Sequence, residues 1–301
     1  MYSIGKGLFL IYRLLLAATF ALLIISVAGC GGGGQDAQAQ EPLRVGLVPN
    51  QNPEKVEAEY APLADYLSKE VGKRVELSVP ASYNAVVEAM ASGELDLAYF
   101  GGLTYVQARE RAKVHPLVTE INPRTRDTTY RSVIIVPSES TVREVSELRG
   151  EDFAFGSVSS TSGSLYPSIM LKEAGIDYRT DLGETTYTGG HDATAQAVAG
   201  GRVAAGGIED RILYRLEEEG AIEEGSVRVI AESEPIQGYP WVVRDDLPDD
   251  LEGSIADAYL NMEDPELLDL LGAEGYERVE ARDYDYVEEQ ARELDLLTEG
   301  Q

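Results

Sequence analysis

Residues Phe153–Ser164 read FAFGSVSSTSGS, and this stretch carries the strongest structural signal in the chain. Three apolar residues typical of a buried strand run into glycines and hydroxyl residues, and helical apolar spacing resumes at Leu165. The first turn of a helix presents unpaired N–H groups and a partial positive charge. We therefore expect a strand, a loop and a helix start that can hold a tetrahedral oxyanion without a lysine.

The hydroxyls and the second glycine of this loop are the first candidate ligand contacts. Ser160, Thr161 and Ser162 offer hydroxyl donors, and Gly163 lets an anion approach the backbone closely. The same residues could instead serve only as helix caps in a solvated loop. The pattern alone leaves both interpretations open.

Strand and helix signals alternate on both sides of this stretch. Strands are expected at 43–48, 74–79, 95–100, 133–136, 153–155, 184–187, 203–208, 227–231 and 241–243, with helices between most of them and helical segments at the end. Alternation of this kind favours parallel strands joined by right-handed crossovers. Two such units followed by a return predict an α/β protein with two lobes, each a mostly parallel sheet flanked by helices, joined by crossing strands.

A second glycine-rich junction lies at Leu97–Thr104, which reads LAYFGGLT. Ligands of open α/β sheets bind outside the carboxyl ends of the strands, which is where both junctions would lie. We expect one of Tyr99 and Phe100 to point into the core and the other toward a cleft. Plain core packing of both aromatic residues is the alternative.

Two further residues near strand ends carry candidate chemistry. His191 follows two glycines and precedes a helix, where it could donate to an oxyanion, although a lone histidine is more often packed or exposed without a role. Glu209 would repel a fully ionised anion but accept a hydrogen bond from a protonated P–OH group. Its alternative role is that of an acid interacting with a helix dipole.

The N-terminal segment has the features of an export signal. Lys6 and Arg13 flank the start, Leu14–Val27 is almost wholly apolar, and small residues precede Cys30. The apolar run is shorter than the roughly 20 residues of a membrane-spanning helix. Cys30 is the only cysteine, so it forms no disulfide within the chain. The sequence Val-Ala-Gly-Cys resembles a bacterial lipobox, which implies acylation of Cys30.

Charge and composition exclude several classes of partner. The chain carries 25 Lys and Arg residues against 53 Asp and Glu residues. Removing residues 1–29 removes two basic residues and no acid, which moves the formal charge from −28 to about −30. Such acidity argues against nucleic acid as a partner. No His/Cys cluster predicts a metal site, and no cofactor is expected.

Several segments together resemble the phosphate-, phosphite- and phosphonate-binding proteins of ABC importers. The similar segments are Ser159–Pro167, Leu95–Gly101, Gly190–Val198 and Gly238–Arg244. This resemblance implies a type II periplasmic-binding-protein fold with a two-strand hinge. It also implies a monomer, lipid-anchored on the outer side of the cell membrane, that delivers a small phosphorus oxyanion to an ABC permease.

The resemblance also implies domain limits and contacts. The expected parts are a signal peptide at 1–29, a lipidated tether at 30–41, a first lobe at 42–134 and 234–301, and a second lobe at 135–233. Phosphorus–oxygen contacts fall on Ser160, Thr161, Ser162 and His191, and the aromatic residues Tyr83 and Phe100 match positions that line the cleft. Glu209 falls where relatives place an acid facing the ligand. Tyr239 stands where aminoalkylphosphonate binders carry an acid, which favours a smaller ligand.

Two other function classes remain open on the sequence. An exported hydrolase could use His191 as base and Glu209 as its orienting acid, although no Gly-x-Ser-x-Gly motif is present. A ligand-sensing or sulfonate-type binding lipoprotein would share the fold and the site. Ester turnover would separate the hydrolase from the binding proteins, and neighbouring permease genes would separate transport from sensing.

Overall fold

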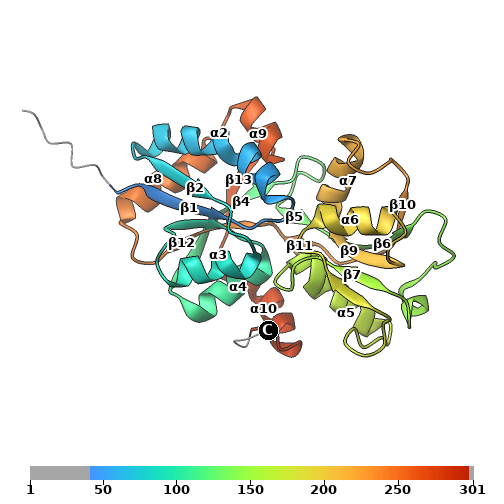
Figure 1. The fold of residues 1–301 in the computed structure, drawn as a ribbon. Coiled ribbons are helices and arrows are strands. Elements are labelled where there is room, and N and C mark those ends of the chain that lie inside the picture. The colour runs from blue at the N-terminus through green and yellow to red at the C-terminus, as the bar shows by residue number, and fades with distance from the viewer. Residues whose placement is uncertain (1–40, 298–301) are drawn as a thin grey trace, which may run out of the picture. The chain divides into compact units, whose positions relative to one another are not determined.

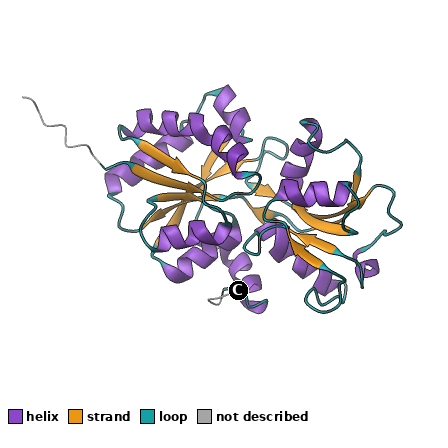
Figure 2. Ribbon diagram, viewed as in Figure 1, coloured by secondary structure: helices purple, strands orange, loops and turns teal. Residues whose placement is uncertain are grey.

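The computed structural model describes residues 41–297, which form one compact unit. The predicted signal peptide, Cys30 and nearly all of the tether lie outside the described residues. Two β-sheets, each with helices on both faces, make two lobes, and a short third sheet lies between them (Figures 1 and 2). Within residues 41–297, no helix is long and apolar enough to span a membrane.

The first lobe is built on a six-stranded sheet with the order β13-β4-β12-β3-β1-β2. Its strands are β1 (Leu43–Leu47), β2 (Val75–Ser78), β3 (Leu97–Tyr99), β4 (Val114–Ile121), β12 (Pro240–Arg244) and β13 (Gly275–Arg278). Helices α2 (Pro53–Val71), α8 (Asp249–Leu260) and α9 (Pro265–Leu271) cover one face, and α3 (Tyr83–Ala91) and α4 (Gly102–Arg111) cover the other (Figure 1). Local signals explain the limits of α2: the Asn52 side chain caps its first turn, and Gly72 ends it with a φ of 64°.

The second lobe is built on a five-stranded sheet with the order β10-β6-β9-β7-β8. Its strands are β6 (Ser132–Pro137), β7 (Phe153–Phe155), β8 (Thr185–Tyr187), β9 (Ala205–Glu209) and β10 (Val227–Glu232). Helices α6 (His191–Ala199) and α7 (Asp210–Glu218) cover one face, and α5 (Tyr166–Glu173) covers the other (Figure 1). A 3₁₀-helix, η2 (Val145–Leu148), precedes β7, and a π-helical turn, η3 (Thr161–Leu165), leads into α5.

Two antiparallel two-residue strands connect the lobes: β5 (Thr129–Tyr130) pairs with β11 (Ile236–Gln237). Strand β5 continues into β6, and β11 continues into β12, so the chain passes between the lobes twice at this hinge (Figure 1). The C-terminal 3₁₀-helix η4 (Ala281–Tyr284) and helix α10 (Asp285–Glu293) pack against α4 of the first lobe. Lys172 of the second lobe reaches Glu293 of α10 at 2.6 Å.

Both sheets are mixed rather than mostly parallel. Strands β1, β2 and β3 run parallel, as do β7, β8 and β9, because helices connect them as right-handed crossovers require. Strands β12 and β6 are antiparallel to their neighbours. Each of these two strands arrives directly from a hinge strand, without a helix to turn the chain around, and therefore enters its sheet in the opposite direction.

Candidate functional site

The hydroxyl-rich loop after β7 forms the start of a helix. Ser160 caps it, because its Oγ accepts a hydrogen bond from the Gly163 N–H at 3.0 Å. The N–H groups of Thr161 and Ser162 lie in the first turn, where no intrahelical acceptor exists. A Cβ at Gly163 would lie 2.9 Å from Ser160 Oγ and 3.2 Å from His191 Cε1. Glycine is therefore needed here for close approach, and the loop presents N–H and hydroxyl donors together.

Loops of both lobes meet at this helix start. The Thr161 Oγ1 of the second lobe accepts a hydrogen bond from the Leu103 N–H of α4, at 2.9 Å. The Ser159 hydroxyl donates to Asn84 Oδ1 at 2.6 Å, and the His191 N–H donates to the Asn50 carbonyl at 2.8 Å. These contacts hold the two lobes together around the loop, so the described arrangement is a closed one.

His191 is the first residue of α6 and is 1% exposed. Its Nδ1 accepts a hydrogen bond from the Glu209 N–H at 3.4 Å, which assigns the single ring proton to Nε2. Burial lowers the pKa of His191 and outweighs the opposing effect of Glu209 and Asp192. The ring is therefore neutral near pH 7 and offers one N–H donor.

Nine buried side-chain polar atoms have no hydrogen-bond partner among residues 41–297, and three of them belong to the loop region, to α6 and to the hinge: Ser162 Oγ, His191 Nε2 and Tyr130 Oη. Buried polar groups in native proteins are nearly always paired, because an unpaired one costs free energy. All three can donate to an oxyanion. The hinge residue Tyr130 was not among the predicted site residues, since a two-residue strand carries no periodic signal.

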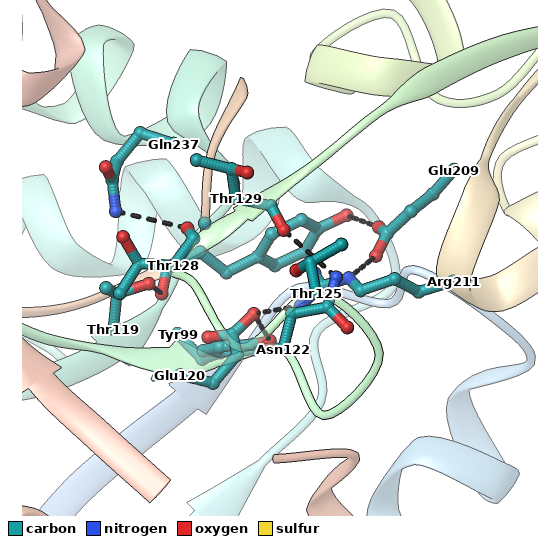
Figure 3. A network of polar contacts seen from close by, with 12 residues as sticks. Tyr99, Thr119, Glu120, Asn122, Thr125, Thr128, Thr129, Glu209, Arg211 and Gln237 are labelled. Atoms are coloured by element: carbon teal, nitrogen blue, oxygen red, sulfur yellow. Dashed lines mark hydrogen bonds and ion pairs between the residues drawn. The ribbon is translucent and has the colours of Figure 1, made fainter. Parts of the chain in front are cut away.

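The predicted acid Glu209 ends β9 and is 2% exposed. Its Oε2 accepts a hydrogen bond from the Tyr239 hydroxyl at 2.8 Å and lies 4.0 Å from His191 Nε2. Its Oε1 accepts a hydrogen bond from Arg211 Nε at 2.6 Å (Figure 3). The arrangement thus sets a carboxylate oxygen beside the unpaired imidazole N–H. Sequence reasoning missed Arg211, which stands in an ordinary amphipathic helix.

The other predicted aromatic residues take different positions. Tyr99 donates its hydroxyl to Glu120 Oε1 at 3.2 Å, and Phe100 is fully buried. Tyr83 is the first residue of α3 and is 1% exposed; burial raises its pKa, so its hydroxyl stays protonated. Within the described part of the chain, no group of three His, Cys, Asp or Glu residues could hold a metal ion.

The model of the family described as "ABC transporter, phosphonate, periplasmic substrate-binding protein" matches residues 45–284. The chain belongs to this family. It is a family of extracytoplasmic substrate-binding proteins rather than of enzymes. Its members supply ligand to ABC importers, which places the function of this chain outside the cytoplasm.

Similar proteins agree with this assignment. The chain is 28% identical to the "Probable ABC transporter phosphite binding protein PhnD1" of Prochlorococcus marinus (strain MIT 9301), over 85% of this chain and 90% of the relative. It is 29% identical to the "Phosphate-import protein PhnD" of Mycolicibacterium smegmatis, over 77% of each. The crystal structure of the Prochlorococcus PhnD1 with methylphosphonate is similar to the structure of this chain, with a TM-score of 0.74 and 26% sequence identity. The match covers 84% of this chain and 98% of that chain. These similarities, with the two mixed sheets and the hinge, identify the fold as that of a two-lobed type II periplasmic binding protein.

Proposed function

We propose that this protein captures a small, singly protonated phosphorus oxyanion, such as phosphite, phosphate or methylphosphonate, and delivers it to an ABC importer. The observation that carries the proposal is the set of three buried donors without a partner among residues 41–297, one of which, His191 Nε2, lies 4.0 Å from the Glu209 carboxylate. A ligand with several oxygens and one remaining P–OH proton would satisfy these donors and could also donate to Glu209. The names of similar proteins support the same ligand class.

The ligand contacts we propose are those of the closed loop region. The first-turn N–H groups and the hydroxyls of Ser160, Thr161 and Ser162 bind phosphorus–oxygen groups, together with His191 Nε2. Tyr83 and Tyr130 add phenol donors, and Gly163 allows the close approach. Tyr99, Phe100 and Tyr239 act through packing and hydrogen bonding at the border of the site.

The carboxylate selects among oxyanions. A sulfonate carries no proton near neutral pH, so it cannot donate a hydrogen bond to Glu209, and its negative charge is repelled by the carboxylate. An aminoalkylphosphonate needs an acid for its ammonium group, and the neutral Tyr239 stands where aminoalkylphosphonate binders carry that acid. The site therefore favours small phosphorus oxyanions over both.

The same geometry supports binding without turnover. A hydrolase of the Ser–His–acid type needs an imidazole nitrogen free to take a proton from serine. His191 Nδ1 faces a backbone N–H, so Nε2 carries the proton and acts as a donor. We further propose that acylated Cys30 anchors the protein to the outer side of the membrane, as a monomer, with residues 31–41 as the tether to the described body.

Isothermal titration calorimetry on residues 41–301 tests the proposal. We expect heat of binding with at least one of phosphite, phosphate and methylphosphonate, and none with methanesulfonate or 2-aminoethylphosphonate at the same concentration. Phosphorus-31 NMR of the mixtures should show no new product. Absence of heat and of a thermal shift for all three phosphorus ligands would refute the assignment.

A further inference from the structure

The Arg211 side chain, in the first turn of α7, is 14% exposed and lies between two acids that are 3% exposed. Its Nε donates to Glu209 Oε1 at 2.6 Å, and its Nη1 donates to Glu120 Oε1 at 2.9 Å (Figure 3). One guanidinium therefore neutralises parts of two buried carboxylates. The fork of N–H donors that makes this possible is particular to arginine.

Aromatic residues fix the guanidinium in this position. Its Cζ lies 4.9 Å from the ring centre of Tyr130 and 5.7 Å from that of Tyr239. The hydroxyl of Tyr239 binds Glu209, and the hydroxyl of Tyr99 binds Glu120. The two carboxylates and the two rings leave Arg211 little freedom to move without breaking an ion pair.

This cluster connects the two lobes. Glu120 belongs to β4 of the first sheet, whereas Glu209 and Arg211 belong to the second lobe, and Tyr130 belongs to the hinge strand β5. The Arg211–Glu120 pair requires the closed lobe arrangement. The Arg211–Glu209 pair lies within one lobe and does not depend on closure.

We infer that Arg211 is a positioning residue that couples the protonation preference of the site to closure of the lobes. It fixes the Glu209 carboxylate with Oε2 as an acceptor beside His191, and it binds Glu120 when the lobes close. The inference rests on the proposed function only for the identity of the ligand.

Other titratable and charged groups also face this cluster. They are Glu59 and Tyr60 of α2, Tyr83 of α3, Tyr99 of β3, His191 and Asp192 of α6, Asp210 and Arg215 of α7, and the residues Tyr130 and Tyr239. Burial raises the pKa of Tyr83, Tyr99, Tyr130 and Tyr239 and lowers that of His191, so all five stay neutral near pH 7. Burial also raises the pKa of Asp210, but this group is present in every variant compared below.

Two substitutions separate the role of the Arg211–Glu209 pair from that of the Arg211–Glu120 pair. Arg211→Met leaves Glu209 buried without its cation, which favours uptake of a proton by the carboxylate. We expect methylphosphonate affinity to fall about tenfold or more, and the preference for the protonated ligand to disappear. Glu120→Gln removes the charge that pairs with Arg211 across the lobes and leaves the Arg211–Glu209 pair in place, so affinity should fall while the pH preference remains. Arg228→Met is the control, because the Arg228 guanidinium donates to the Ser140 and Val142 carbonyls within the second lobe, and this variant should change neither.

A thermodynamic cycle without ligand tests the connection between lobes. Thermal unfolding of Arg211→Met, Glu120→Gln and the double variant should be non-additive, with the double variant destabilised less than the sum of the single ones. Additive losses would refute the contact between lobes. If the pH dependence of affinity is unchanged in Arg211→Met, the inference that Arg211 acts on Glu209 is refuted. If the wild-type protein binds no phosphorus oxyanion, the proposed function fails while this cycle still decides whether Arg211 joins the lobes.

Discussion

Ser162→Ala should weaken ligand binding without weakening the fold. The Ser162 side chain is fully buried, and its Oγ has no partner within residues 41–297. An unpaired buried hydroxyl costs about 1–3 kcal/mol in the ligand-free protein. Replacing it with a methyl group removes that cost, so the unfolding temperature without ligand should stay level or rise.

The effect on affinity has the opposite sign. A hydrogen bond to a charged group contributes about 1.5–3 kcal/mol, and each 1.4 kcal/mol is a factor of about ten in the dissociation constant. We therefore expect Kd to rise roughly 10- to 150-fold. Calorimetric titration with methylphosphonate, beside differential scanning calorimetry of the ligand-free protein, measures both quantities.

Ser164→Ala is the matched control in the same loop. The Ser164 hydroxyl donates to the Ser157 carbonyl at 2.6 Å, so its loss should cost stability, about 1 kcal/mol, and leave Kd nearly unchanged. Ser162→Ala should therefore lose affinity and keep its stability, whereas Ser164→Ala should lose stability and keep its affinity. Wild-type affinity in Ser162→Ala would refute the reasoning that the unpaired hydroxyl awaits the ligand.

Three further predictions concern charge. Affinity should fall as the ligand loses its last proton, because Glu209 must then face a second negative charge; Glu209→Gln should flatten this dependence, and an unchanged profile would remove Glu209 from the site. The two histidines should have opposite effects on stability. Burial lowers the pKa of His191, so its contribution to folding stability is present above about pH 6.5 and is lost as the pH falls. For His115, burial also acts to lower the pKa, but hydrogen bonds to Asp245 and Glu252 outweigh burial and raise the pKa. The contribution of His115 to folding stability is therefore lost as the pH rises. Comparing unfolding temperatures of His191→Gln and His115→Gln with wild type from about pH 5 to 8 checks this, and slopes of equal sign would contradict it. Finally, the net charge of −28 repels an anion at long range, and salt screens this within about 10 Å at 0.1 M; stopped-flow association should therefore speed up or stay level with added salt, and a steep fall would indicate a basic entrance.

The sequence pattern predicts the alternation of apolar strands and amphipathic helices, because each element buries one periodic face. It predicted strands near β1, β3, β7 and β9 and the two lobes. Strand β4, which contains His115 and Pro116, and strand β13, where helix was expected, were missed. Both pair with partners far away in the chain, so their strand character comes from the sheet rather than from local pattern.

The sequence by itself determined which loop presents donors, since Ser160–Ser162, Gly163 and the following helix start lie next to one another in the chain. It also placed His191 and Glu209 at the ends of neighbouring elements. Only the tertiary structure decided which charges and hydroxyls meet: Arg211 lies between Glu209 and Glu120, and the Tyr130 hydroxyl has no hydrogen-bond partner within residues 41–297. These contacts join residues up to 91 positions apart. Periodicity says nothing about such pairs, because a buried ion pair depends on the position of both lobes at once.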